Sequence, residues 1–262
     1  MVQLLGRLNH LLIKYNYKSD LISFIKNSVY QSLHKVLIVV IKVNRKKVLV
    51  LEDLVAQLRQ RAALLTDDMQ FWIGLAGGPG SGKSTIAEAL KAQLDKMLTV
   101  IPLDGYHYYR SELDDMEDPE EAHIRRGAPF TFNSTRFVED LIKARDTGEG
   151  VFPSFDHAIG DPVEATIQLH KGPQIVLVEG NYVLLDTEPW CQLRKSVFDE
   201  TWFLDVPLSV CNQRVAERHV KTGLTEEQAQ LRVATNDGIN AELIAKVSPG
   251  NADRIIQIMM SL

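Results

Sequence analysis

Residues 71–85 read FWIGLAGGPGSGKST, an apolar stretch that runs into the pattern G-x-x-x-x-G-K-S. Its glycines let the backbone turn inward, so that successive N–H groups can point at the oxygens of a bound phosphate. Lys83 would neutralise the outer phosphates, and Ser84 would offer a hydroxyl to Mg²⁺. The stretch predicts a strand, a loop and a helix, with a nucleoside triphosphate bound by Gly77, Gly78, Pro79, Gly80, Ser81, Gly82, Lys83, Ser84 and Thr85.

The residues after this loop have helical spacing. Ile86, Leu90, Leu94 and Met97 recur at intervals of three or four and predict one buried stripe. Packing of this stripe would hold the positive end of the helix dipole against the phosphates. Upstream, residues 51–65 (LEDLVAQLRQRAALL) have the same periodicity, so we expect the folded domain to begin near residue 50.

Composition restricts the class of protein. The chain has 262 residues, 45% hydrophobic and 24% charged, which suits one well-buried domain plus an appendage. Two cysteines, Cys191 and Cys211, cannot form a disulfide framework or a four-cysteine zinc site; they favour a reducing, cytoplasmic location and are expected to be buried. The longest apolar runs, such as Val36–Ile41, are far shorter than the ~20 residues of a membrane span, so none is expected.

Charge divides the sequence into two regions. Residues 1–48 contain nine Lys or Arg against one acid, Asp20, whereas the whole chain carries −5, so the remainder is strongly acidic. An acidic body argues against nucleic-acid binding. We therefore separate a basic N-terminal extension, residues 1–50, from a domain at 51–262. Three interpretations of the extension stay open: a targeting or interaction arm, a poorly packed tail, or an upstream stretch translated from a start codon assigned too early.

A second strand narrows the chemistry. Residues 98–103 are apolar and end in Asp104, which would lie at the carboxyl end of a parallel strand, where open α/β sheets bind ligands. There it could take a proton from a substrate hydroxyl, or only cap a turn. The sequence contains no N-K-x-D guanine-reading motif, no LSGGQ-like transporter signature and no second triphosphate motif.

Five further blocks carry a family resemblance, which covers roughly residues 70–258. The chain resembles the phosphoribulokinase, uridine kinase and bacterial-type pantothenate kinase group of P-loop kinases, most closely its nucleoside or nucleotide kinase-like branch. The matching blocks are DGYH at 104–107, RRGAPFTF at 125–132, PSFDH at 153–157, VEGNY at 178–182 and NDGINA at 236–241.

The resemblance implies a P-loop NTPase fold, a doubly wound three-layer α/β/α arrangement with a mostly parallel sheet. A helical acceptor region would follow the second strand, and a short lid would follow Pro207. It implies transfer of the γ-phosphoryl group of Mg·ATP to a hydroxyl of a sugar, nucleoside or pantothenate-like metabolite, and a homodimer is common in the group. The alternative is a regulatory or scaffold protein that binds ATP and hydrolyses it slowly.

The resemblance also implies roles for residues on the nucleotide side. Asp104 would be the general base, and Glu179 would bind Mg²⁺ with Ser84, in preference to its rival Asp205. Arg214 and Arg218 lie four residues apart and would clamp the transferred group, unless they only face solvent. Further residues are expected at the lid and nucleotide edge: Arg232, Asn236 and Asn240, with Arg254 either at the adenine or in a capping role.

On the acceptor side, the matching positions are Tyr106, His107, Arg126, Phe155, Asp156, His157 and Asp161. Asp156 and Asp161 would accept hydrogen bonds from substrate hydroxyls, which favours a polyol, sugar or ribose. Phe155 stands where uridine and pantothenate kinases often have Tyr, and His157 either orients the acceptor or is a plain loop residue. Arg126 and its neighbour Arg125 would bind an anionic acceptor or only tether the acidic run at 112–121.

Overall fold

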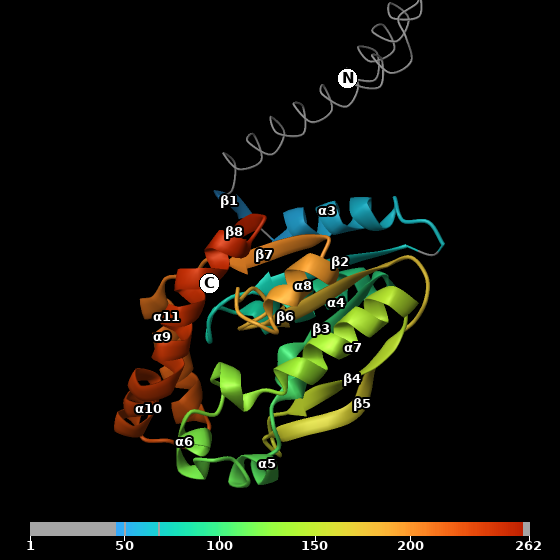
Figure 1. Cartoon of the computed structure of the whole chain (residues 1–262). Helices are drawn as coiled ribbons and strands as arrows, with labels where there is room; N and C mark the ends of the chain where they lie inside the picture. The colour runs from blue at the N-terminus through green and yellow to red at the C-terminus, as the bar shows by residue number, and fades with distance from the viewer. Residues whose placement is uncertain (1–45, 50, 68, 259–262) are drawn as a thin grey trace, which may run out of the picture. The chain divides into compact units, whose positions relative to one another are not determined.

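A six-stranded, all-parallel sheet forms the centre of the molecule (Figure 1). The computed structural model describes residues 46–49, 51–67 and 69–258, so the predicted extension at 1–45 lies outside the described residues. In spatial order the strands are β1 (Lys46–Leu49), β8 (Arg254–Ile258), β7 (Glu200–Leu204), β2 (Gln70–Ala76), β6 (Gln174–Gly180) and β3 (Leu98–Pro102). The parallel sheet that the sequence predicted is confirmed.

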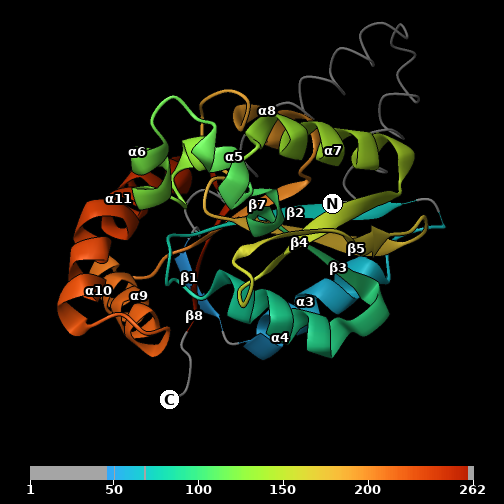
Figure 2. The ribbon, with the colours of Figure 1, turned by 90° about the horizontal axis from the view of Figure 1, so that it is seen from below.

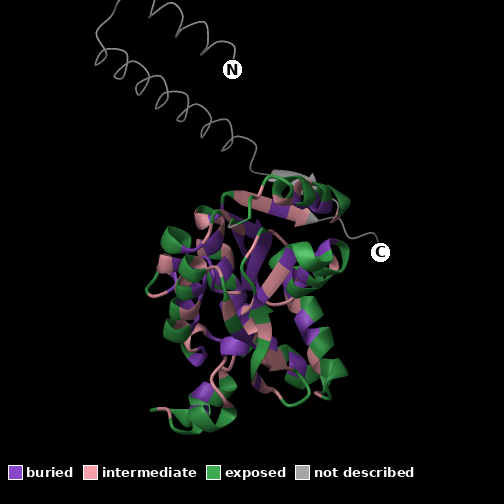
Figure 3. Cartoon of the chain, turned by 90° about the vertical axis from the view of Figure 1, so that its right-hand side faces the viewer, coloured by how far each residue is buried: buried purple, intermediate pink, exposed green. Residues whose placement is uncertain are grey.

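Helices cover both faces of this sheet (Figure 2). The helices α3 (Leu51–Ala62) and α4 (Lys83–Leu94) lie on one face, and α7 (Ser134–Thr147) and α8 (Cys191–Ser196) lie on the other. Strand side chains alternate between the two cores: Ile73 and Leu75 face α4, whereas Trp72 and Ala76 face the α7 side. Burial on both faces explains why these strands read as continuous apolar runs, and Figure 3 shows the buried interior beneath exposed outer helix faces.

The helix that follows the phosphate-binding loop is shorter than its apolar stripe. Ile86, Leu90 and Leu94 are buried as expected, but α4 ends at Leu94 and the chain turns into a 3₁₀ segment at Asp95–Met97. Asp95 has a positive φ of 47°, which breaks the helical path. Met97 is consequently 38% exposed, and the expectation that it extends the stripe is wrong.

The region after β3 combines helices with a hairpin. A 3₁₀ turn (Leu103–Tyr106), α5 (Arg110–Asp114), α6 (Pro119–Ile124), a second 3₁₀ turn (Pro129–Thr131) and α7 precede the antiparallel strands β4 (Gly150–Asp156) and β5 (Asp161–Leu169). The sequence predicted a helical acceptor region, which is present, and the hairpin is an addition that it did not predict. Pro153 is accommodated because the pairing register shifts between Phe152 and Ser154.

The predicted lid after Pro207 is a helical arm. It consists of α9 (Leu208–Lys221), α10 (Glu226–Arg232), one π-helical turn (Val233–Asp237) and α11 (Gly238–Val247), followed by a 3₁₀ turn (Ser248–Asn251) and β8. Val215, Ala216, Ala229 and Val233 form its own small core. The arm lies at one side of the sheet in Figures 1 and 2.

Two expectations from composition have different outcomes. Among the described residues, every helix is too short or too polar to cross a membrane. Cys211 is buried as expected, but Cys191 is only half-buried, and its thiol lies 2.9 Å from Glu188 Oε1. Cys191 is the first residue of the short helix α8, whose buried face carries Leu193 instead.

Candidate active site

The phosphate-binding loop depends on glycine at two positions with positive φ. Gly80 (φ 76°) packs against the lid helix, where an added Cβ would lie 2.4 Å from the backbone oxygen of Cys211. At Gly82 (φ 92°) an added Cβ would meet no atom within 4 Å, so this part of the loop faces open space. The Ser81 hydroxyl is buried and has no hydrogen-bond partner among the described residues. The loop thus presents its backbone at Gly82 to a ligand, as phosphate binding requires, whereas the Ser81 hydroxyl stays buried.

Lys83 is buried and held in position by two oxygens. Its Nζ donates to Asn181 Oδ1 at 2.8 Å and to the Gly78 carbonyl at 3.2 Å. Burial lowers the pKa of the amine, and the nearby carboxylates of Glu179 and Asp104 oppose that change. Asn181 lies in the VEGNY block, but sequence reasoning gave it no role, because its contact joins segments 98 residues apart.

Ser84 and Glu179 form an oxygen pair beside the loop. The Ser84 hydroxyl donates to Glu179 Oε1 at 2.9 Å, and Glu179 is buried at the end of β6. Burial raises the pKa of this carboxyl to about 7, against the opposing influence of Lys83. A hydroxyl and a carboxylate are the oxygen donors that Mg²⁺ accepts when phosphates supply further ligands, so the residues fit the ion.

Asp104 lies in the 3₁₀ turn that follows β3, on the wall of a cleft of about 830 Å³ that also exposes Lys83 and Glu179. The turn fits closely against the hairpin, because a Cβ on Gly105 would lie 2.3 Å from the Pro153 carbonyl oxygen. The rival acid, Asp205, is not a lining residue of this cleft and accepts a hydrogen bond from Gln257 Nε2 at 2.9 Å.

The lid contributes several cationic side chains to the same cleft. The lining residues from the arm are Arg214, Arg218, His219, Thr222, Arg232, Asp237 and Asn240. Arg214 Nη1 reaches the Gly80 carbonyl at 3.4 Å, and His219 Nε2 lies 2.9 Å from Asp237 Oδ2. The Nε of Arg232 is buried without a partner among the described residues. The arm therefore places positive charge opposite the phosphate-binding loop.

The acceptor wall contains only part of the predicted set. His107, Arg126, Phe155 and His157 line the cleft, together with Arg110, Gly127, Phe132 and Gly160, whereas Tyr106, Asp156 and Asp161 do not. Tyr106 is buried and donates to Asp140 Oδ2 at 2.9 Å, and burial raises the pKa of its phenol. Asp156 Oδ1 accepts from the backbone N–H groups of Ala158 and Ile159 at 2.7 and 3.2 Å.

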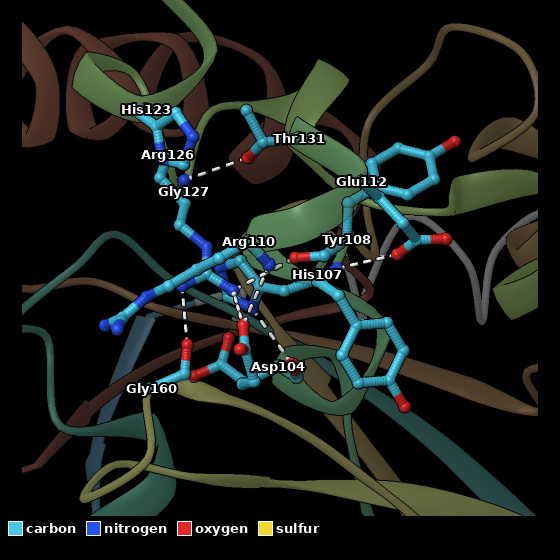
Figure 4. Close-up of polar contacts among 12 residues, drawn as sticks. Asp104, His107, Tyr108, Arg110, Glu112, His123, Arg126, Gly127, Thr131 and Gly160 are labelled. Atoms are coloured by element: carbon cyan, nitrogen blue, oxygen red, sulfur yellow. Dashed lines mark hydrogen bonds and ion pairs between the residues drawn. The ribbon is translucent and has the colours of Figure 1, made fainter. Parts of the chain in front are cut away.

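Asp161 is likewise engaged by the protein. Its Oδ1 accepts from Arg126 Nη2 at 2.7 Å and from the Arg110 backbone N–H at 3.1 Å. Arg126 also donates to the carbonyl oxygens of Gly160 and Tyr108 at 2.5 and 3.0 Å (Figure 4). This arginine therefore fixes the hairpin turn against the 104–110 segment. Sequence reasoning missed Arg110, whose one signal was its position three residues after the DGYH block.

Two of the sequence blocks meet between the acceptor region and the lid. Arg125 Nε donates to Asn236 Oδ1 at 3.2 Å, and Asn240 Nδ2 donates to the same oxygen at 3.0 Å. Asn236 Nδ2 in turn donates to the Arg126 carbonyl at 2.9 Å. Both asparagines are buried, so this junction joins the 125–127 turn to the π-helical turn of the arm.

Arg254 is not brought to the cleft. Its guanidinium donates to Gln57 Oε1 at 2.8 Å, lies 3.2 Å from Glu200 Oε1 and stacks 5.2 Å from the centre of the Trp202 ring. It begins β8, whereas the ligand-binding edge of a parallel sheet lies at the carboxyl ends of the strands. The position does not support the expected contact with adenine.

Comparison with known proteins agrees with the fold. The model of the "Phosphoribulokinase / Uridine kinase family" matches residues 72–228. A Schizosaccharomyces pombe protein named as a candidate uridine kinase is 43% identical over 192 residues, which are 70% of this chain and 81% of that protein. The ATP-dependent kinase YFH7 of Kluyveromyces lactis is 33% identical over 198 residues, 60% of this chain but only 56% of that protein.

A solved structure with a similar fold is that of a candidate fructose transport system kinase from Silicibacter. It superposes with a TM-score of 0.68 and 28% identity, over 81% of this chain and 100% of the other.

Proposed function

Because the chain belongs to the phosphoribulokinase and uridine kinase family, we propose that it transfers the γ-phosphoryl group of ATP to a hydroxyl of a small metabolite. One observation carries the proposal: Asp104, a carboxylate outside the phosphate-binding loop, shares a cleft with Lys83 and Glu179. A protein that only bound and slowly hydrolysed ATP would not need such a base opposite the loop.

In the proposed reaction, Asp104 accepts the proton of the acceptor hydroxyl. The hydroxyl oxygen forms a bond to the γ-phosphorus of ATP, and the bond from that phosphorus to the bridging oxygen breaks, which leaves ADP. Lys83 neutralises charge on the phosphate oxygens, and Asn181 keeps its amine aimed at them. In this reaction the Asp104 carboxylate acts on the attacking hydroxyl, and the Lys83 amine acts on the phosphate oxygens.

Ser84 and Glu179 would hold Mg²⁺, which when bound supplies positive charge at the phosphate oxygens. Arg214 and Arg218 approach from the arm, where Arg214 already reaches the loop at the Gly80 carbonyl. Closure of the arm would bring both guanidiniums to the transferred group and exclude water that would otherwise hydrolyse ATP. The cytoplasmic location that the sequence favours and the homodimer that is common in the resembled group stay predictions.

The test measures ADP formation by the full chain with Mg·ATP against a panel of sugars, nucleosides, their phosphates and pantothenate. We expect at least one compound to stimulate turnover clearly above basal hydrolysis. The near-isosteric change Asp104→Asn should remove most of that stimulation, by about 10²–10⁴-fold.

Asp205→Asn is the matched control, since Asp205 also follows a sheet strand but does not line the cleft. It should leave the stimulated rate within about twofold of the unaltered protein. Equal stimulation in Asp104→Asn and the unaltered protein would contradict the base assignment. Hydrolysis that no compound stimulates would favour the regulatory alternative.

A further inference from the structure

On the basis of the proposed function, we infer that the phosphoryl acceptor is an anion, a hydroxyl compound that also bears a carboxylate or phosphate group. The geometry points to Arg110, on the acceptor wall of the cleft, as a residue that binds this group. The inference takes up the anionic acceptor that the sequence left open at Arg125 and Arg126, and departs from a polyol, sugar or ribose held by Asp156 and Asp161.

The first argument is the charge of the cleft. Its walls carry three acids, Asp104, Glu179 and Asp237, and twice as many permanent or near-permanent cations: Lys83, Arg110, Arg126, Arg214, Arg218 and Arg232. In the proposed function, the cations of the loop and the arm would bind the phosphates of the nucleotide. Arg110 and Arg126 lie at the other end, beside His107 and His157, where a nucleotide phosphate does not account for them.

The second argument is that the acids of the acceptor region are engaged elsewhere. The Asp156 carboxylate closes the turn between β4 and β5, and the Asp161 carboxylate binds Arg126 and the Arg110 backbone. Neither lines the cleft. A sugar or ribose is usually held through carboxylate or amide acceptors for its several hydroxyls. On the described acceptor wall, Asp104 is the one carboxylate, and its role is to take the proton.

The third argument is the state of Arg110. Its backbone N–H binds Asp161, but no hydrogen bond or ion pair of its guanidinium is found among the described residues. The guanidinium lies against the hairpin turn, because a Cβ on Gly160 would lie 2.3 Å from its Nη2. Figure 4 shows Arg110 and Arg126 beside the turn at Gly160. A guanidinium is a planar, charged group of hydrogen-bond donors, so one without a partner can bind a carboxylate or phosphate through two parallel hydrogen bonds.

Arg126 supports this site without being its main ligand. Three acceptors already engage its Nη atoms, and its side chain is only 13% exposed. Its remaining Nε is buried and has no partner among the described residues. Arg126 therefore adds positive charge at the wall and fixes the turn that supports Arg110, while the proton and phosphoryl steps stay as proposed above.

The experiment separates binding from turnover. The full chain is saturated with Mg²⁺ and a non-hydrolysable ATP analogue, then titrated calorimetrically with matched pairs of compounds. The pairs are ribose 5-phosphate with ribose, fructose 6-phosphate with fructose, uridine monophosphate with uridine, and pantothenate with panthenol. The first three test a phosphate and the last a carboxylate. We expect an anionic member to bind at least about tenfold more tightly than its neutral partner.

Variants assign the effect to Arg110. Arg110→Gln should weaken binding of the preferred anion about tenfold, which reduces the difference in affinity between the anion and its neutral partner. Arg110→Glu should weaken binding of the anion further. Arg61→Gln is the control, because Arg61 is also exposed but stacks on Phe71 outside the cleft. Arg61→Gln should leave the affinity for every compound of the panel unchanged.

The outcomes distinguish this inference from the proposed function. Neutral members that bind as tightly as their anionic partners, no binding by any anion, or an unchanged affinity in both Arg110 variants would each overturn the anion site. An anion that binds through Arg110 but is not phosphorylated when ATP replaces the analogue would leave the site standing and count against the kinase proposal.

Discussion

The two ends of the cleft are organised in opposite ways. At the nucleotide end, functional side chains bind one another: Lys83 binds Asn181 and Ser84 binds Glu179. At the acceptor end, Asp156 binds the backbone of its own turn, Asp161 binds Arg126 and the Arg110 backbone, and the guanidinium of Arg110 has no partner among the described residues. The side chains of the nucleotide end are therefore held in place before any ligand binds, whereas at the acceptor end the Arg110 guanidinium is still free to bind one.

The contrast also separates two kinds of acid. Glu179 is buried at the end of β6 and has a raised pKa, whereas Asp156 accepts backbone hydrogen bonds in an exposed turn. A carboxylate at the correct place in a sequence block can thus serve the reaction or only its own loop. The following predictions test the contrast, from the largest expected effect to the smallest.

Removal of the amine at the centre of the nucleotide end should have the largest effect. Lys83→Ala removes the one lysine that lines the cleft, and the acceptor-stimulated rate should fall about 10³–10⁵-fold. This rate is measured as steady-state ADP release in the presence of the acceptor. The control is Lys171→Ala, which removes an exposed lysine 3.4 Å from Glu149 on the hairpin, and should leave the rate unchanged. Comparable losses in both variants would contradict pre-organisation at Lys83.

Protonation of Glu179 should be visible in the stability of the protein free of metal and nucleotide. Its pKa is raised from 4.5 to about 7, so between these values the folded state binds one proton more than the unfolded state. The stabilisation is complete below pH 4.5 and is lost as pH rises through about 7. It amounts to roughly 3 kcal/mol, because each pKa unit corresponds to about 1.4 kcal/mol.

The measurement is urea unfolding with a chelator present, from pH 5 to pH 8, beside Glu179→Gln. The glutamine does not titrate, so the unaltered protein should lose stability relative to Glu179→Gln as pH rises. If the stability of both proteins depended on pH in the same way, Glu179 would have an ordinary pKa, and burial would not raise it.

Charge on the arm should matter for the rate more than for nucleotide affinity. Arg218 lines the cleft. When the arm closes, contact of its guanidinium with the transferred group should raise kcat about 10²-fold. Arg218→Gln should therefore lower kcat and leave the KM for ATP within about threefold. The matched control is Glu217→Gln, one residue earlier on α9, whose Oε1 accepts from Gln213 away from the cleft. If Glu217→Gln lowered kcat as much as Arg218→Gln does, the loss would come from a disturbed α9 helix and not from the missing guanidinium.

Asp156 should give the smallest effect. Asn at an equivalent turn position also accepts backbone hydrogen bonds, so Asp156→Asn should preserve the turn and change the KM for the acceptor by less than about threefold. Asp156→Ala loses the turn contacts and serves as the comparison variant. If Asp156→Asn raised that KM by tenfold or more, Asp156 would contact the acceptor, and the two ends would be less different than the structure indicates.

The sequence predicts the fold around the nucleotide end because its signals there are local, although it missed Asn181 and expected Arg254 at the cleft. The glycines of the loop, the stripe at Ile86, Leu90 and Leu94, and the acid after each buried strand follow from backbone and periodicity. Met97 failed because the positive φ at Asp95 ends the helix earlier than the apolar pattern does. The parallel sheet also follows, since apolar strands alternate with amphipathic helices.

The acceptor end was harder to predict because its contacts are distant in sequence. The sequence did not predict the hairpin, because Pro153 and the turn residues obscure the strand pattern, and only the pairing with Asp161–Leu169 reveals it. The engagement of Asp161 by Arg126 spans 35 residues, and the contact of Arg125 with Asn236 spans 111. A resemblance between blocks shows that such residues belong to a family pattern, but not which oxygen each one binds.

The pairing of β1 with β8 has a practical consequence for protein production. Residues 46–49 complete the hydrogen bonding of the final strand on its outer side, although the predicted domain boundary lay at residue 50. A fragment that started at residue 50 would leave the backbone of β8 open along one edge, and open edges recruit strands from other molecules. Expression from Lys46 or earlier would keep this pairing, whereas the shorter fragment would expose β8 as a new sheet edge.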